Sequence, residues 1–355
     1  MLKKAAAMFL LASSIAMWMG CVTNSSRYLY AALPTPSEIV AYREDPNSGV
    51  LTVLAGSPIT AGPAVQSLVI HPSKKFLYAA NSFENDISLF AISNTGALTE
   101  QGSRTLTGTT PTLLSMDKAG QFLYSANVGS GNISSFSIDA STGSLSQVTG
   151  SPFAIGTSPL NMVLAPSGNI LYVTSAGTPG TIEICSFTAG VLTQVQLMQQ
   201  GVGTNPYGLA IDPSGGHLYL ANSGPDNTIS EYAINSDGTL KFLATIGGSN
   251  LTGPTALLID NSGKYLYAAN TASANLAGFS IASNGSLSLL ATNDIVATNA
   301  SPSYLVSDPS GKYIFVGSSS TAAIQSFSLD SGSGTLSVIA SYSVGSKPTS
   351  IAVTP

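Results

Sequence analysis

The chain has 355 residues, of which 44% are hydrophobic and only 8% are charged, and its formal net charge is −5. The high apolar content supports a large buried core and excludes an intrinsically disordered chain. The acidic balance and the lack of a basic patch argue against a nucleic-acid partner.

The N-terminus has the pattern of an export signal. A basic start is followed by an almost wholly apolar stretch that ends at Gly20 and Cys21. The sequence WMGC over residues 18–21 resembles the bacterial lipoprotein processing site, although that site usually has an aliphatic residue in place of Trp18. The resemblance implies a signal over residues 1–20, lipidation of Cys21 and a short tether over residues 21–26. An uncleaved membrane anchor and cleavage by an ordinary signal peptidase are the alternatives.

We therefore expect an exported lipoprotein that a membrane holds only through its N-terminal lipid. The periplasm, the outer membrane and the cell surface all fit this expectation. The other cysteine, Cys185, has no partner for an internal disulfide, so we expect it to be a small core side chain. Separately, we expect the mature protein to be a monomer.

From residue 27 onward, a short apolar strand ending in an aromatic residue recurs at spacings of 46 to 48 residues. Its seven aromatic residues are Tyr30, Tyr78, Tyr124, Tyr172, Tyr219, Tyr267 and Phe315. A regular period of this length is typical of propellers and stacked repeat proteins. We expect the aromatic side chains to pack between repeats.

Each repeat has the same internal order. Two apolar strands flank a turn such as Asp212-Pro213-Ser214-Gly215, in which Asp, Pro and Gly each favour the turn geometry. A polar loop follows, then an alternating strand such as residues 133–138, a glycine turn and a fourth strand. Four strands in about 47 residues match one propeller blade.

The two ends of the repeat region complete each other. Residues 27–30 read as the second strand of a repeat, and residues 349–353 read as a first strand. We predict an all-β, seven-bladed β-propeller of four-stranded antiparallel blades over residues 27–355, in which the C-terminal strand pairs into the first blade and closes the ring. An open β-solenoid is the alternative, but it would leave sheet edges exposed and would have no use for a split repeat.

The aligned repeats resemble the seven-bladed β-propeller family that includes 6-phosphogluconolactonase and related lactonases, and also the YVTN-repeat surface proteins. Residues 171–175 (LYVTS) come within one residue of the YVTN repeat, and residues 264–270 (KYLYAAN) have the form that both groups share. The resemblance covers residues 27–355 and implies the fold, with lactone hydrolysis as a possible activity. The matching residues are turns and core strands, so no catalytic residue can be carried over.

The expected innermost strands lack the groups that lactone hydrolysis ordinarily uses. Opening a lactone with water calls for a general base and for donors that stabilise the oxyanion. None of the seven segments contains Asp, Glu, Lys, Arg or His: Gln66–Ile70, Thr112–Met116, Leu160–Leu164, Tyr207–Ile211, Thr255–Ile259, Ser303–Ser307 and Thr349–Val353. The catalytic residues therefore stay unknown, and we expect no metal and no cofactor.

Charged residues recur where these strands end. They are Asp117, Asp212, Asp260 and Asp308, with His71 in the same column. One interpretation is an acidic ring that holds a cation. The interpretation we favour is a turn-capping side chain that repeats because the turn repeats. We expect His71 to replace Asp in this turn, and we assign no catalytic role to it or to His217.

Four asparagines directly follow second strands. They are Asn81, Asn127, Asn222 and Asn270. We expect them to cap the adjacent loops by bonding nearby backbone rather than to bind a ligand.

The start of the innermost strands gives the candidate binding site. Hydroxyl and amide side chains gather there, and a surface of this kind suits a neutral sugar-like or peptide ligand better than a phosphate. The candidate residues are Gln66, Thr112, Asn161, Tyr207, Thr255, Ser303, Tyr304 and Thr349. The alternative is that these side chains only bond one another within the ring.

Two functional classes remain. The sequence favours a lipid-anchored envelope propeller that binds a partner protein or a neutral glycan. The alternative is an extracytoplasmic lactonase-like hydrolase that opens a sugar or other lactone. Whether the protein is an enzyme stays open at this stage.

Overall fold

The computed structural model describes residues 26–156, 158–290 and 295–355. The predicted signal, the lipidation site Cys21 and most of the tether lie outside the described residues. Within these residues, no helix is long and apolar enough to cross a membrane.

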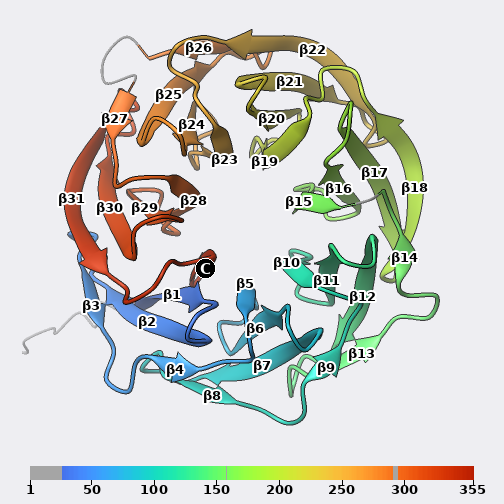
Figure 1. Cartoon of the computed structure of the whole chain (residues 1–355), viewed down its shortest axis with the longest axis vertical. Coiled ribbons are helices and arrows are strands. Elements are labelled where there is room, and N and C mark those ends of the chain that lie inside the picture. Colours follow the sequence, from blue (N-terminus) through green and yellow to red (C-terminus); the bar gives the residue numbers. More distant parts are fainter. Residues whose placement is uncertain (1–25, 157, 291–294) are drawn as a thin grey trace, which may run out of the picture.

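Seven antiparallel sheets stand around a central channel, as predicted (Figure 1). We number the blades in chain order from the one that contains the start of the described chain. The innermost strands of blades 2 to 7, followed by that of blade 1, are β5 (Val65–Ile70), β10 (Pro111–Met116), β15 (Pro159–Leu164), β19 (Asn205–Ile211), β23 (Pro254–Ile259), β28 (Pro302–Ser307) and β32 (Ser350–Val353).

The second and third strands form the middle of each blade. The second strands of blades 1 to 7 are β1 (Arg27–Leu33), β6 (Phe76–Asn81), β11 (Phe122–Asn127), β16 (Ile170–Ser175), β20 (His217–Ser223), β24 (Tyr265–Asn270) and β29 (Tyr313–Ser318). The third strands are β2 (Glu38–Glu44), β7 (Asp86–Ile92), β12 (Asn132–Ile138), β17 (Thr181–Thr188), β21 (Thr228–Ile234), β25 (Asn275–Ile281) and β30 (Ala323–Leu329).

The outer strands differ between blades. They are continuous in blades 4, 5 and 7, as β18 (Val191–Met198), β22 (Leu240–Gly247) and β31 (Leu336–Ser343). In blades 1, 2, 3 and 6 two short pieces pair with the same third strand: β3 (Leu51–Val53) with β4 (Ile59–Thr60), β8 (Leu98–Glu100) with β9 (Thr105–Leu106), β13 (Leu145–Gln147) with β14 (Phe153–Ala154), and β26 (Leu287–Leu289) with β27 (Ile295–Ala297). Each blade thus keeps four strand positions.

The C-terminal strand closes the ring. β32 pairs antiparallel with β1, in a register that places Leu29 opposite Val353 and Ala32 opposite Ser350. The inner edge of blade 1 is therefore covered by the other end of the chain. The split repeat correctly predicted this closure, and the open solenoid is excluded.

The repeated tyrosines lie between blades, as predicted, and most of them also bond across the interface. In five blades the tyrosine hydroxyl donates to a glycine carbonyl of the next blade at 2.6–2.9 Å. The pairs are Tyr30 with Gly96, Tyr78 with Gly143, Tyr172 with Gly238, Tyr219 with Gly285, and Tyr267 with Gly334. Burial raises the pKa of these tyrosines, so their hydroxyls remain protonated donors.

The repeated asparagines do not cap the loops through backbone alone. They are buried and donate Nδ2 hydrogen bonds to side chains of the third strand, as Asn81 does to Ser88 at 3.0 Å. Asn127 and Asn222 make equivalent bonds to Ser134 and Ser230. Asn270 donates to Asn275, the first residue of its third strand, as Asn81 also does to Asp86. These bonds hold the second strand to the third at the end nearest the loops.

Cys185 is a core residue, as predicted. It is 3% exposed, and burial raises the pKa of its thiol to about 12. A thiol in such surroundings is unreactive at neutral pH.

Candidate functional site

A cavity of about 750 Å³ occupies the end of the channel where the innermost strands begin. We call this end the upper mouth. All eight candidate side chains line it: Gln66, Thr112, Asn161, Tyr207, Thr255, Ser303, Tyr304 and Thr349. The structure thus brings together every predicted residue from six innermost strands and the residue before β32, while their role in binding stays a prediction.

A β-bulge in the innermost strands shapes this lining. In each of β5, β10, β15, β19, β23 and β28 the pairing register shifts at the second or third residue of the strand. Consecutive residues such as Ser303 and Tyr304, or Leu160 and Asn161, therefore both line the cavity. A regular strand would turn every second side chain away from the channel. The bulge therefore adds to the side chains that such blades contribute at the mouth.

Some of the candidate side chains bond within the ring, as the alternative interpretation expects. Asn161 Nδ2 donates to the Tyr207 carbonyl at 2.6 Å, which ties blade 4 to blade 5. Thr349 Oγ1 donates to the Val65 carbonyl at 3.1 Å. Ser303 Oγ donates to the hydroxyl of Ser319 at 2.7 Å. These bonds fix the rim of the mouth.

Other polar groups of the mouth have no protein partner. Within the described chain, the hydroxyls of Thr112, Tyr207 and Tyr304 make no hydrogen bond to the protein, and Thr255 Oγ1 is buried without one. Tyr207 is 38% exposed. Burial raises the pKa of Tyr304, so this hydroxyl is a donor at neutral pH. The mouth therefore presents hydrogen-bonding groups that are not used by the fold.

The lining is uncharged. Of the described residues that enclose the cavity, none is Asp, Glu, Lys, Arg or His. Across the same described ranges, no three His, Cys, Asp or Glu side chains gather as a metal site would require. Such a surface can hydrogen-bond neutral oxygen atoms and polarise a carbonyl, but its side chains offer no general base.

The turns between the first and second strands of blades 2 to 7 lie at the opposite end of the channel, and we call this end the turn face. Its aspartates cap their own turns: Asp117 accepts from the Phe122 N–H at 2.6 Å, and Asp260 accepts from the Tyr265 N–H at 2.8 Å. His71 takes the same place, because its Nδ1 accepts from the Ser73 N–H at 3.0 Å. The capping interpretation is confirmed for these residues, and their oxygens are not directed at a shared cation.

One pair on this face was missed in the sequence. His217 Nδ1 lies 2.8 Å from Asp212 Oδ2, five residues earlier in the same turn. The His217 ring covers Gly285 of the next blade, in the position that aromatic rings occupy elsewhere in the ring of blades. This packing and the absence of a nearby nucleophile in the described contacts give the pair a structural role.

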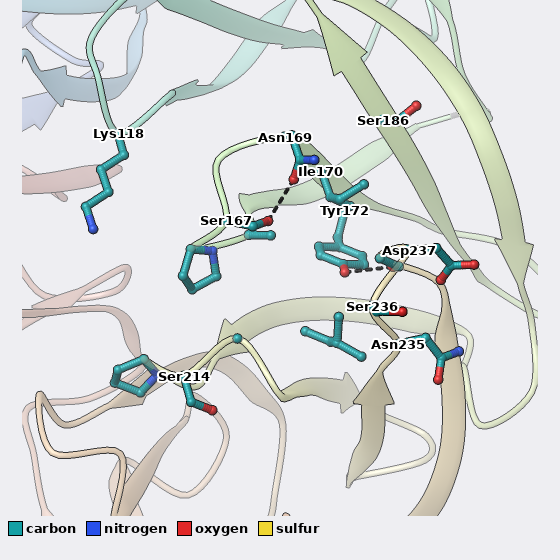
Figure 2. A pocket seen from close by; sticks show the side chains of 16 residues that line it. Lys118, Ser167, Asn169, Ile170, Tyr172, Ser186, Ser214, Asn235, Ser236 and Asp237 are labelled. Carbon is teal, nitrogen blue, oxygen red and sulfur yellow. Dashed lines mark hydrogen bonds between the residues drawn. The ribbon is translucent and has the colours of Figure 1, made fainter.

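A second cavity, of about 680 Å³, opens on the turn face between blades 4 and 5 (Figure 2). It lies where Ile170 covers Gly238. The other six blades place a ring at this position over a glycine of the next blade: Tyr28, Phe76, Phe122, His217, Tyr265 and Tyr313. The cavity is therefore the space that a smaller side chain leaves, and its polar residues belong to turns. The upper mouth, where seven blades converge, is the better candidate site.

Comparison with known proteins gives a consistent result. The family model described as "Lactonase, 7-bladed beta-propeller" matches residues 24–158, 169–293 and 243–355. A 6-phosphogluconolactonase of Cronobacter sakazakii is 36% identical over 107 residues, which are 30% of this chain and 31% of that protein. The match thus spans about a third of the length of such curated relatives.

Two solved structures share the whole fold. The periplasmic gluconolactonase PpgL of Pseudomonas aeruginosa superimposes with a TM-score of 0.77 at 18% identity, over 93% of this chain and 99% of that one. A protein from Lactobacillus plantarum gives a TM-score of 0.81 at 20% identity, over 92% and 99%. At these identities the likeness shows the fold alone. The comparisons as a set favour the lactonase alternative and give no support to the binding module that the sequence favoured.

Proposed function

Because the chain belongs to the seven-bladed β-propeller lactonase family, we propose that it hydrolyses an uncharged, hydroxyl-bearing lactone held in the upper mouth. The observation that carries this proposal is the cavity itself, which is lined by hydroxyl and amide groups alternating with apolar side chains and, among the described residues, by no charged side chain. Sugar-type lactones offer many neutral oxygen atoms that match these donors and acceptors.

The lack of charge argues against a phosphorylated substrate. A phosphate group in proteins is ordinarily held by Arg, Lys or several backbone N–H groups, which make strong charge-assisted hydrogen bonds. Moving a phosphate dianion from water into a cavity without such partners has a large desolvation cost. Several relatives are 6-phosphogluconolactonases, and we expect this chain to differ from them in its preferred substrate.

The proposed chemistry uses groups that have no other partner. The hydroxyls of Tyr304 and Tyr207 would donate to the lactone carbonyl and stabilise the oxyanion as a water oxygen attacks the carbonyl carbon. The ring C–O bond then breaks, the proton lost by the water passes through solvent to the departing ring oxygen, and a hydroxy acid leaves. Positioning and oxyanion stabilisation supply the rate enhancement, because no general base stands in the described lining.

The test is hydrolysis of glucono-δ-lactone and of 6-phosphogluconolactone by the full-length protein in detergent, with the buffer rate subtracted. We expect saturable turnover of the uncharged lactone and a clearly lower kcat/KM for the phosphorylated one. Preference for the phosphorylated lactone would contradict the uncharged-substrate proposal. No turnover of any lactone by a folded sample would contradict hydrolysis and return the cavity to a purely binding role.

A substitution identifies the site. Tyr304→Phe should lower kcat by roughly 10²-fold, the effect of removing one oxyanion donor, with a smaller change in KM. The matched control is Tyr265→Phe, which removes a tyrosine hydroxyl that bonds the Gly332 carbonyl on the turn face. Equal losses in the two variants would show that the Tyr304 effect is not specific to the mouth.

A further inference from the structure

The start of β1 fixes where the N-terminal tether leaves the propeller. The Arg27 guanidinium contacts Asp308 and lies 3.3 Å from Ser310 Oγ, both in the turn between β28 and β29. The Tyr28 hydroxyl donates at 2.8 Å to the Asn94 carbonyl, in a turn of blade 2. The other end of β1 lies at the upper mouth, where the Thr349 N–H donates to the Ala32 carbonyl. The chain therefore enters the propeller at the turn face.

Chain length limits what a lipid at Cys21 could reach. Six residue steps separate Cys21 from Arg27, a span of about 20 Å when fully extended. The seven-residue strand β1 alone crosses about 20 Å between the two faces. A path from the turn face to the mouth side must also pass outward beyond β2 and β3, about 10 Å more at ordinary strand spacing. A tether of this length cannot bring the upper mouth against the membrane.

Exposed lysines lie on the inner part of the turn face, in several blades around the ring. Lys75, Lys264 and Lys312 occupy the position in blades 2, 6 and 7 that Arg27 occupies in blade 1, and all three are exposed. Lys74 and Lys118 add two more on the inner turns, and Figure 2 shows Lys118 extending from its turn. The capping aspartates beside them are buried.

The outer turns of the same face have the opposite charge. Asp45, Asp139, Asp237 and Asp330 are exposed there. With the buried capping aspartates counted as well, the acidic groups named on this face outnumber the basic ones. Charge alone would therefore not draw this face to an anionic surface, and the lipid must supply the affinity. Lys75 and Lys312 are the lysines nearest the anchor, because their blades flank blade 1, and they are placed to contact headgroup phosphates although the exposed Asp45 lies close to Arg27.

We propose that a lipid on Cys21 holds the turn face against phospholipid headgroups, so that the upper mouth opens away from the membrane. The proposal rests on lipidation of Cys21 and not on the proposed enzymatic activity. Its consequence is that substrate would reach the cavity from the aqueous compartment without passing the bilayer surface.

The experiment uses full-length protein with its lipid, reconstituted in phosphatidylcholine and phosphatidylglycerol vesicles. One cysteine is introduced for a fluorophore in each of three variants: Ala119→Cys on the turn face, Phe83→Cys in the exposed loop beside the mouth, and Val53→Cys on the outer strand of blade 1. Cys185 is buried and unreactive, so it can remain. Quenching by a headgroup-linked spin label reports which face meets the lipid.

We expect several-fold stronger quenching at Ala119→Cys than at the other two positions. Strongest quenching at Val53→Cys would mean that the propeller lies on its edge, and strongest quenching at Phe83→Cys would mean that the mouth faces the lipid; either result overturns the proposal. Equal quenching at all three would do the same. A mass spectrum of the intact protein that shows no lipid on Cys21 would remove the basis of the proposal.

A charge-reversed variant tests whether the lysines contribute to membrane contact in addition to the lipid anchor. In Lys75→Glu/Lys264→Glu/Lys312→Glu, quenching at Ala119→Cys should fall in vesicles that contain phosphatidylglycerol and stay unchanged in pure phosphatidylcholine. An equal response in both kinds of vesicle would show that the lysines do not contact anionic headgroups.

Discussion

In six of the seven blades the third strand presents an apolar residue to the neighbouring blade at the turn face, whereas the interface between blades 7 and 1 contains a buried ion cluster. At the six ordinary positions, the residue at or next to the end of the third strand is apolar and packs on the core: Ile92, Ile138, Phe187, Ile234, Ile281 and Leu329. Blade 1 has Glu44 in this place, with its side chain fully buried.

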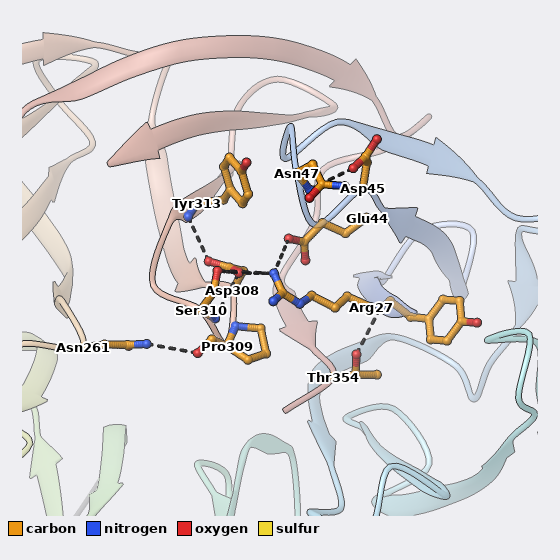
Figure 3. Close-up of polar contacts among 11 residues, drawn as sticks. Arg27, Glu44, Asp45, Asn47, Asn261, Asp308, Pro309, Ser310, Tyr313 and Thr354 are labelled. Carbon is orange, nitrogen blue, oxygen red and sulfur yellow. Dashed lines mark hydrogen bonds and ion pairs between the residues drawn. The ribbon is translucent and has the colours of Figure 1, made fainter. Parts of the chain in front are cut away.

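The cluster joins the two ends of the chain. Arg27 lies between Glu44 and Asp308, at 3.4 Å from Glu44 Oε1 and in direct contact with Asp308 (Figure 3). Two carboxylates share one guanidinium, and within the described chain Glu44 Oε2 has no partner. The interface that closes the ring thus contains an ion cluster where the other blades have an apolar side chain. A buried ion pair is weak evidence of added stability, because the cost of removing both charges from water offsets much of their attraction.

The largest effect should come from removing the shared cation. Arg27→Ala leaves two buried carboxylates without their positive partner, and we expect a loss of about 3–5 kcal/mol of unfolding free energy at pH 8. Urea unfolding measures the change. The control is Arg43→Ala, which removes an exposed arginine from β2. A loss within 1 kcal/mol would mean that the cluster does not hold the ring closed.

The second effect is a pH dependence. Burial, and next the Asp308 charge, raise the pKa of Glu44 to about 7 despite Arg27. The folded state therefore binds this proton more tightly than the unfolded state does, so stability falls as pH rises from about 4.5 to about 7, by roughly 3 kcal/mol at most. Glu44→Gln should reduce the difference in stability between pH 5 and pH 8 in urea titrations, and the remainder should come from Asp86, Glu183 and Glu231, whose pKa values burial also raises. Glu38→Gln at the other end of β2 should leave the slope unchanged.

The same comparison shows what the sequence could predict. The fold followed from the repeat period and from the split repeat, because both are properties of the whole chain. The ion cluster did not, since Arg27 and Asp308 are 281 residues apart and only the closed ring brings them together. The sequence indicated the cluster only through Glu44, a carboxylate at a position where the other six repeats have an apolar residue.

The candidate site could also be predicted only in part. The position of Tyr207 or Thr255 after a strand-starting proline located the mouth. The bulge that lets Ser303 and Tyr304 both line the cavity has no residue signature, and the proposed activity rests on the comparisons, because the described lining contains no catalytic motif.

A third, smaller effect concerns the ordinary interfaces. Tyr78→Phe removes the bond to the Gly143 carbonyl and leaves that carbonyl without its partner in a buried interface. We expect a loss of about 1 kcal/mol in urea unfolding, with no dependence on pH between 5 and 8. A pH-dependent loss would mean that the ordinary interface is coupled to ionisable groups, which would remove its contrast with the interface between blades 7 and 1.

The smallest effect is expected in blade 3, which has the repeated tyrosine but lacks the hydrogen bond from its hydroxyl to a glycine carbonyl of the next blade. Tyr124 has a buried hydroxyl that, among the described residues, finds no partner, because Ser135 Oγ donates to the Gly190 carbonyl at 2.7 Å instead. Tyr124→Phe should therefore be neutral or stabilising by up to about 1 kcal/mol. In a Ser135→Ala background the Gly190 carbonyl becomes available to Tyr124, and the same substitution should then cost about 1 kcal/mol, as it does in the other blades. Equal effects in the two backgrounds would show that Ser135 does not compete for this carbonyl.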